Sequence, residues 1–271
     1  MSPLWRDQVQ ALLTPTDLTL VRFSRGVWPK TMAKSVVPVT EGHESGMPNW
    51  TGALLTLGQA LSSKEWADAD LSVILSNHFV RHQVIPWRDE LRDESELIEF
   101  SRQSMRKTYG RQAVQWSIEM SLDRAGQPYV ASAVDSRLLD ELKAVTTAQG
   151  RRLRSIRPLL MEAFNWAKEW LTDSYQWLVI VEEGMICASL VGKGGWVVVR
   201  SLRSRSDWPS EVVAMLEREQ FVVDEAEAAQ TVLLHIVKGE QVELPANQWT
   251  VRHLRSCQAN RAGASVLQCA L

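Results

Sequence analysis

The chain has 271 residues, of which 45% are hydrophobic and 23% are charged, and its formal net charge is −2 at pH 7. These values are typical of a globular protein with one large or two ordinary domains, and they exclude a broadly basic surface for nucleic acid. The three cysteines, Cys187, Cys257 and Cys269, are far apart. Their spacing fits neither a disulfide framework nor a close-spaced zinc site, and it favours a reducing compartment.

The N-terminal stretch mixes acidic and basic residues ahead of a short apolar run. No uninterrupted apolar run reaches the ~18 residues that a membrane-spanning helix needs. We therefore expect a cytoplasmic protein that has no membrane span of its own.

The first elements are predicted from apolar spacing. Residues 17–23 and 31–40 have strand character on either side of a turn that contains Gly26. They predict two antiparallel strands. Asn49 is a good N-cap, and the apolar residues of 50–61 recur at helical spacing, which predicts an amphipathic helix on a sheet.

Residues 71–87 predict a strand, a polar turn and a second strand, which Pro86 must end because proline has no N–H for a ladder. A helix follows over 91–109, with acidic residues early and basic residues late, as the helix dipole favours. Apolar and polar residues then alternate over 114–122. This alternation predicts a strand with one solvated face in a small sheet.

Residues 129–134 predict another strand, and Asp135 caps a helix that Gly150 ends. A strand over 152–156 comes next, and Pro158 opens a further helix at its first position.

The second half begins with three predicted antiparallel strands, at 177–181, 185–191 and 196–200. The remaining predicted elements are a helix over 210–220, a buried strand over 232–237 and an edge strand over 249–254. Both halves thus share an order of hairpin strands, helix and strand.

Two stretches carry a resemblance to known families. Residues 71–87, LSVILSNHFVRHQVIPW, contain a strand, a polar turn followed by an arginine, and a closing Ile-Pro-Trp step, and residues 129–165 have the order strand, helix, strand, helix. They resemble the pilus-assembly protein PilM and the cytoplasmic actin-like domain of the type II secretion protein GspL. The resemblance implies an α/β fold of two actin-like (RNase H-like) domains, the second truncated, with a small α+β subdomain inserted in the first. We expect a first domain over 1–172, its insertion over about 79–128, and a second domain over 173–271.

An actin-like ATPase needs a strand-turn-strand with small turn residues, so that backbone N–H groups can approach phosphates, and an acid that holds the metal. The turn at 23–28 has one glycine and no acid. At the second candidate turn, Glu182 and Gly184 stand where the family has Asp and Gly, but the larger acid and Met185 would crowd a phosphate. An ordinary hairpin turn with exposed acids is the alternative. We expect a degenerate phosphate turn and no cofactor or metal.

Other chemistry is not indicated by the sequence. The five histidines lack the spacing of metal ligands, and no serine lies in a nucleophile-elbow pattern. His235 lies within an apolar run and is predicted to be a hydrogen-bonded core histidine.

The resemblance implies a non-catalytic cytoplasmic adaptor or scaffold of a type IV pilus or type II secretion-like assembly, which a partner recruits to the inner membrane. The implied partners are the cytoplasmic tail of an inner-membrane assembly protein and, as a second candidate, the assembly ATPase. The alternative is a divergent actin-like protein that binds or hydrolyses ATP. In PilM-like proteins the tail lies in a groove of the first domain, between its core and the small inserted subdomain, where Arg81 and Trp87 would contact it here. Trp87 alternatively plugs the base of the insertion.

Overall fold

The computed structural model describes residues 6–26, 28–40, 47–91, 93–122, 126–192, 195–205, 207–239, 242–245 and 248–254. The strands are β1 (Asp7–Leu13), β2 (Asp17–Phe23), β3 (Thr31–Pro38), β4 (Ala69–Leu75), β5 (Val80–Ile85), β6 (Trp116–Ser121), β7 (Tyr129–Asp135), β8 (Leu153–Pro158), β9 (Gln176–Glu182), β10 (Met185–Gly192), β11 (Gly195–Arg203), β12 (Thr231–Ile236) and β13 (Thr250–His253). The α-helices are α1 (Thr51–Leu61), α2 (Glu94–Tyr109), α3 (Ser136–Ala148), α4 (Leu159–Ala167), α5 (Trp208–Gln220) and α6 (Asp224–Glu227), and two short 3₁₀ helices are η2 (Lys64–Trp66) and η3 (Gly110–Gln115).

Contacts divide the described residues into two compact units. The first unit holds residues 6–79 and 136–162, and the second holds Val80–Asp135 and Ala163–Leu254. Within the described residues the chain therefore passes from one unit to the other three times. The expected domain boundary at residue 172 stays a prediction.

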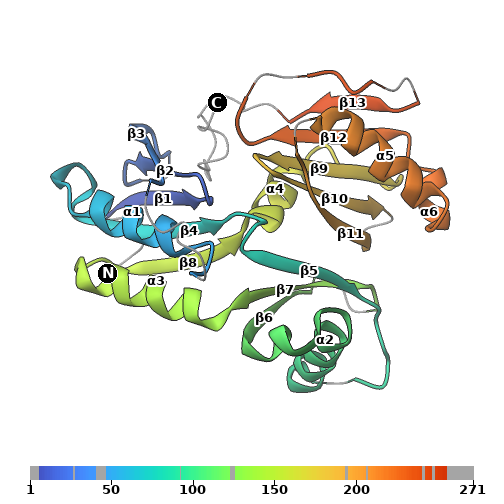
Figure 1. The fold of residues 1–271 in the computed structure, drawn as a ribbon, viewed down its shortest axis with the longest axis horizontal. Coiled ribbons are helices and arrows are strands. Elements are labelled where there is room, and N and C mark those ends of the chain that lie inside the picture. The colour runs from blue at the N-terminus through green and yellow to red at the C-terminus, as the bar shows by residue number, and fades with distance from the viewer. Residues whose placement is uncertain are drawn as a thin grey trace. The chain divides into compact units, whose positions relative to one another are not determined.

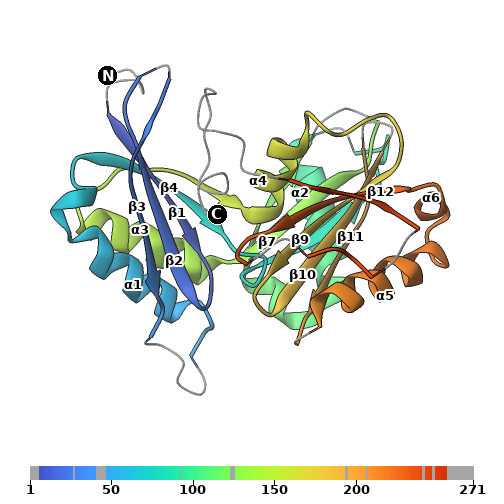
Figure 2. The ribbon, with the colours of Figure 1, turned by 90° about the horizontal axis from the view of Figure 1, so that it is seen from above.

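The first unit is built on a five-stranded sheet in the order β3-β2-β1-β4-β8. β1 is antiparallel to β2, β2 is antiparallel to β3, and β4 is parallel to both β1 and β8. Helices α1 and α3 lie side by side against this sheet (Figures 1 and 2). Their buried leucines, Leu54, Leu57, Leu138 and Leu142, supply the apolar face that holds them there.

The second unit contains a sheet with the same plan, in the order β11-β10-β9-β12-β13. Its strand directions repeat those of the first sheet, since β9 is antiparallel to β10, β10 is antiparallel to β11, and β12 is parallel to both β9 and β13. Val212, Met215 and Leu216 of α5 pack into the core of this sheet. The predicted order of hairpin strands, helix and strand is therefore present in both sheets, and the full strand order is also the same in both.

A smaller sheet, in the order β5-β7-β6, is the second part of this unit and lies against α2. Asp93 caps α2 by accepting from the Glu96 N–H at 2.9 Å. Leu97 and Met105 of α2 and Tyr129 of β7 join one apolar cluster. This α+β piece follows β4 in the chain and precedes α3, and its contacts group it with the second unit. The expected insertion over about 79–128 of the first domain stays a prediction.

The structure corrects four details of the sequence prediction. First, β1 is a strand, although the sequence analysis predicted none there. Second, the two strands of residues 71–87 do not pair: β4 belongs to the first sheet, and β5 pairs with β7. The turn between them is buried, with Ser76 and Asn77 at 0% exposure, and it leads the chain out of the first sheet.

Third, the alternating strand is shorter than predicted. Val114 lies in η3 and Leu122 follows β6, and their exposed fractions are 57% and 46%. Fourth, two helix starts differ by one residue. Trp50 occupies the N-cap of α1 in place of Asn49, and Pro158 ends β8 so that α4 begins at Leu159.

Candidate functional site

The turn between β1 and β2 is the first candidate for a phosphate-binding turn. It occupies the same place in the first sheet as the β9–β10 turn does in the second. The candidate turn at 23–28 instead connects β2 to β3. It was selected because β1 was not predicted from the sequence, which made β2 the first strand. The turn that matters consists of Thr14, Pro15 and Thr16, with Asp17 opening β2.

The polar groups of this turn bond to one another. Thr14 Oγ1 accepts from the N–H of Asp17 at 3.0 Å and from the N–H of Thr16 at 3.3 Å. The Thr14 N–H donates to the carbonyl of Asp17 at 3.0 Å. Oδ2 of Asp17 accepts from the Thr16 hydroxyl at 3.1 Å and lies 3.1 Å from Thr14 Oγ1. Pro15 has no N–H, so every backbone donor of the turn is already bonded within it.

This internal bonding determines what the turn can bind. A phosphate-binding turn must direct unpaired N–H groups at the anion. Here those groups are bonded internally, and the buried carboxylate of Asp17, 5% exposed, adds negative charge behind them. The turn therefore does not present the donors that a phosphate needs.

The β9–β10 turn contains the predicted residues Glu182 and Gly184. Gly184 has a φ of +76°, a left-handed conformation that glycine adopts without strain. Its carbonyl accepts from the Ser204 N–H at 3.1 Å. Glu182 is buried and Glu183 is exposed, so both a buried and an exposed acid stand where an anion would approach. The assignment of a degenerate phosphate turn stays a prediction.

A groove of about 850 Å³ lies in the second unit. One wall is β5 with the end of α2, and the other is β11, which runs alongside β5 (Figure 1). The described residues that line it are Arg81, His82, Gln83, Val84, Pro86, Thr108, Tyr109, Pro128, Met185, Val197, Val198, Val199, Arg200, Ser201, Arg203, Val222 and Val223. We call this feature the β5–β11 groove.

The structure brings only one of the two predicted partner-binding residues to this groove. Arg81 lines it, and its guanidinium donates to the carbonyl of Val80 at 3.0 Å. Trp87 is half-buried and does not appear in the lining, and its Nε1 donates to Oδ1 of Asp89 at 2.8 Å. A role for either residue in partner binding stays a prediction.

The described lining of the groove is basic. It contains Arg81, Arg200 and Arg203 and no aspartate or glutamate. His82 adds no positive charge at neutral pH, because burial lowers its pKa to about 3. Burial also raises the pKa of Tyr109, so its hydroxyl keeps its proton. The groove thus offers guanidinium donors to a ligand, whereas the hydroxyls of Thr108 and Tyr109 donate to the backbone carbonyls of Ser104 and His82. Sequence reasoning missed Arg200 and Arg203 because only the fold brings β11 next to β5.

Catalytic groups are sparse in the part of the chain that the structure describes. No group of three or more His, Cys, Asp and Glu residues there could hold a metal ion. Cys187 is fully buried, and burial raises its pKa to about 12, so it is not a thiolate nucleophile. Within the same residues, no helix combines the length and apolarity needed to span a membrane.

Two sheets of identical strand order and direction, each flanked by helices, define the actin-like class of α/β fold. No protein-family model and no curated protein matches the sequence. Solved structures do match the fold. A chain of the PilM–PilN type IV pilus biogenesis complex aligns over 96% of this chain and 93% of its own, with a TM-score of 0.69 and 12% identity.

The cytoplasmic domain of EpsL (GspL), an inner-membrane component of the type II secretion system of Vibrio cholerae, aligns over 97% of this chain and 92% of its own, with a TM-score of 0.61 and 9% identity. A Bacteroides thetaiotaomicron protein with an actin-like ATPase fold aligns over 88% of this chain and 84% of its own, with a TM-score of 0.57 and 9% identity. The predicted actin-like fold and the resemblance to PilM and GspL are confirmed, and at these identities the likeness concerns the fold.

Proposed function

We propose that this protein is a non-catalytic cytoplasmic adaptor, which binds partner proteins in a type IV pilus or type II secretion-like assembly. Its partner is the cytoplasmic tail of an inner-membrane assembly protein, which recruits it to that membrane, and the assembly ATPase is a second candidate partner. The matching chains come from a PilM–PilN complex and from an inner-membrane component of a secretion system, and this supports the proposal.

The β1–β2 turn is the observation that carries the non-catalytic part of the proposal. The hydroxyl of Thr14 takes both N–H groups that would otherwise face an anion, and Pro15 supplies none. A nucleotide would have to break these hydrogen bonds before it could form its own. Each such bond contributes about 1 kcal/mol net, and a buried donor left without a partner costs more.

Calorimetric titration of the full chain with magnesium-ATP tests this part. We expect no binding heat and no rise in melting temperature, since a well-occupied site stabilises the folded state by mass action. Binding with micromolar affinity would overturn the adaptor proposal.

The rival function is a divergent actin-like protein that binds ATP. Glu182 and the left-handed Gly184 favour it, since an acid followed by a glycine is retained at the β9–β10 turn. If the wild-type chain binds magnesium-ATP and Glu182→Gln does not, the rival is correct.

The partner-binding part is tested by capture of the tail of the inner-membrane assembly protein in a pull-down. We expect Arg81→Ala combined with Trp87→Ala to abolish capture while the melting temperature stays nearly unchanged. The single variants separate the two residues, since only Arg81 lines the β5–β11 groove. Capture by a folded double variant would place the interface elsewhere, and loss of folding would show that these residues are structural.

A further inference from the structure

The β5–β11 groove indicates the chemistry of a partner. We propose that it is the docking site of an acidic, extended segment of a partner protein, whose carboxylates pair with Arg81 and Arg203 while its apolar side chains contact Val197, Val199 and Val222. This inference rests on the proposed adaptor function. It adds to that function a site, a class of ligand and the strands that bind it.

The walls of the groove are two sheet edges. β5 ends the three-stranded sheet and β11 ends the five-stranded sheet among the described residues, and the two strands do not pair with each other. An edge strand carries a row of backbone N–H and C=O groups, and extended peptides bind such edges through main-chain hydrogen bonds. β5 has six residues, which corresponds to a length of about 20 Å at ~3.3 Å per residue. The walls are therefore suited to a segment of similar length.

The charge of the groove determines the sign of that segment. The described lining holds three arginines and no acid, whereas the whole chain has a net charge of −2. Arg200 is held at 3.0 Å from Glu219, so it is partly neutralised. Arg203 is exposed, and Arg81 lies on the opposite wall. Guanidinium groups bind carboxylates through charge-assisted, often bidentate hydrogen bonds, so an acidic segment is the complementary ligand.

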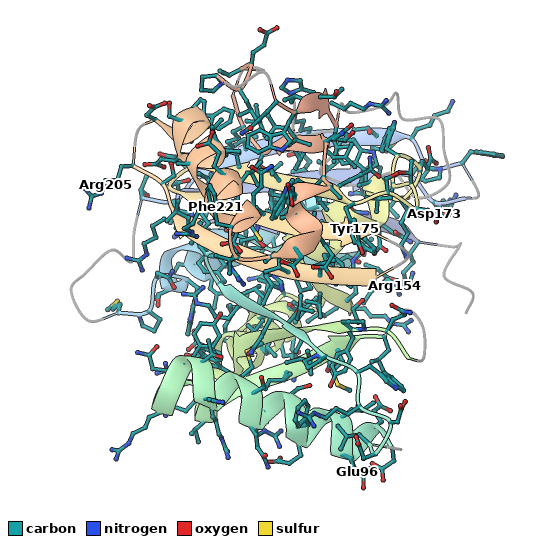
Figure 3. All side chains as sticks on the ribbon, turned by 90° about the vertical axis from the view of Figure 1, so that its right-hand side faces the viewer. Glu96, Arg154, Asp173, Tyr175, Arg205 and Phe221 are labelled. Atoms are coloured by element: carbon teal, nitrogen blue, oxygen red, sulfur yellow. The ribbon has the colours of Figure 1, made fainter. Side chains whose placement is uncertain are left out.

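An exposed apolar residue lies at the rim, and an exposed phenylalanine precedes it in the chain. Val222 lines the groove with 65% of its surface exposed, and the preceding residue, Phe221, is 91% exposed at the end of α5. Figure 3 labels Phe221 beside the orange helix. A phenylalanine so exposed contributes little to the core, and aromatic residues are enriched at protein interfaces. Successive side chains of an extended segment point in opposite directions. In a segment that alternates acidic and apolar residues, the acidic side chains would therefore contact the arginines and the apolar side chains would contact the rim.

The first test uses a fluorescein-labelled peptide of about twelve residues that alternates glutamate with leucine and threonine, long enough to exceed the ~20 Å wall. Its fluorescence anisotropy is titrated with the full chain. We expect saturable binding of this peptide and none of the matched peptide with lysine in place of glutamate. Raising the ionic strength to about 0.5 M should weaken binding about tenfold, because salt screens exposed charges. Equal binding of both peptides would overturn the proposal.

The second test compares two arginines that are close in the chain. Arg203→Glu should weaken peptide binding about tenfold or more, since it replaces an attraction with a like-charge repulsion. Arg205→Glu is the matched control, because Arg205 is also exposed, makes the same change of charge and does not line the groove (Figure 3). We expect it to change the affinity by less than about twofold. Arg81→Ala and Phe221→Ser should each weaken binding, with unchanged melting temperatures as evidence of folding.

The remaining outcomes are informative. If Arg205→Glu weakens binding as much as Arg203→Glu, the attraction is diffuse and the groove is not the site. If single-stranded oligothymidylate displaces the peptide at equal concentration, the groove recognises polyanions, and an acidic protein segment is not its ligand. Binding of magnesium-ATP would overturn the adaptor function, but peptide binding that is weakened by Arg203→Glu would still support the docking site. If magnesium-ATP does not bind and Arg203→Glu leaves peptide binding unchanged, only the docking site is overturned.

Discussion

Nε of Arg200 on β11 lies 3.0 Å from Oε2 of Glu219 on α5, and the Glu219 side chain is only 3% exposed. The pair joins the groove wall to the helix that covers its sheet. Removing one member of a buried ion pair leaves a charge without compensation. We expect Arg200→Met to lower the free energy of unfolding by about 2–3 kcal/mol, less than for a fully buried pair. Arg200 is 40% exposed, and Arg218 still lies 3.3 Å from the other oxygen of Glu219.

Urea denaturation measures this change. The double variant Arg200→Met with Glu219→Gln should recover part of the loss, because it removes the unpaired charge as well. An additive double variant would show that the pair does not couple. This structural role is also why Arg200 is a poor residue with which to test ligand binding.

Gly192 at the end of β10 is predicted to tolerate no side chain. A Cβ at this position would lie 2.9 Å from Cα of Tyr175, and backbone cannot move aside easily. We expect Gly192→Ala to cost about 1–3 kcal/mol in the free energy of unfolding, as overpacking does. Gly195→Ala is the matched control, since its Cβ would meet only the flexible side chain of Gln127 at 3.3 Å. Equal melting temperatures for the two variants would contradict the prediction.

Thr14 is predicted to hold the β1–β2 turn together through its hydroxyl. Thr14→Val keeps the shape of the side chain and removes the acceptor of two N–H groups. We expect a loss of about 1–3 kcal/mol, measured by chemical denaturation, because buried donors are left without partners. Thr16→Val should cost less, since the Thr16 hydroxyl serves only the carboxylate of Asp17 and a longer contact to Thr14. A reversed order of stability would refute this account of the turn.

His235 is predicted to make the protein less stable in acid. It is 1% exposed, its ring stands edge-on to Trp166 at 5.2 Å, and burial lowers its pKa to about 4 from the ordinary 6.5. Between these values the unfolded chain binds the proton and the folded chain does not. Stability therefore falls as the pH drops from 6.5 towards 4, by up to about 1.4 kcal/mol per pH unit from this group.

His235→Leu should flatten that dependence. Urea midpoints measured at several pH values between 4 and 7 would show a smaller slope in the variant. Some slope should remain, because burial also lowers the pKa of His82, to about 3. An unchanged slope would mean that His235 takes up its proton in the folded state.

Elements with strong local patterns could be predicted from the sequence. The strands of the second half are apolar runs, and β9 and β10 are buried along their whole length. β1 was missed because its seven residues, DQVQALL, include two glutamines. One of them, Gln10, is buried at 7% exposure, and only the tertiary structure determines that such a polar residue is inside.

The candidate site was less accessible to sequence reasoning. Arg81 was selected because it follows the polar turn of residues 71–87. It lines the β5–β11 groove, which differs from the implied groove between the first domain's core and the insertion, so its role stays a prediction. Arg203, on the opposite wall, lies far along the chain, and no local pattern indicates that β11 runs beside β5. His235 was predicted to be a hydrogen-bonded core residue, and it is buried, with its ring edge-on to Trp166.

The interleaving of the two units has a consequence for synthesis on the ribosome. The first unit's described segments are finished at Glu162, whereas the inserted piece Val80–Asp135 belongs with strands that are made later. β11 begins roughly 60 residues after the end of β7, which corresponds to about 3–12 s at ~5–20 residues per second. During that interval the edge of β5 has no neighbour. The apolar cluster shared by α2 and the small sheet gives the nascent chain a core of its own while it waits.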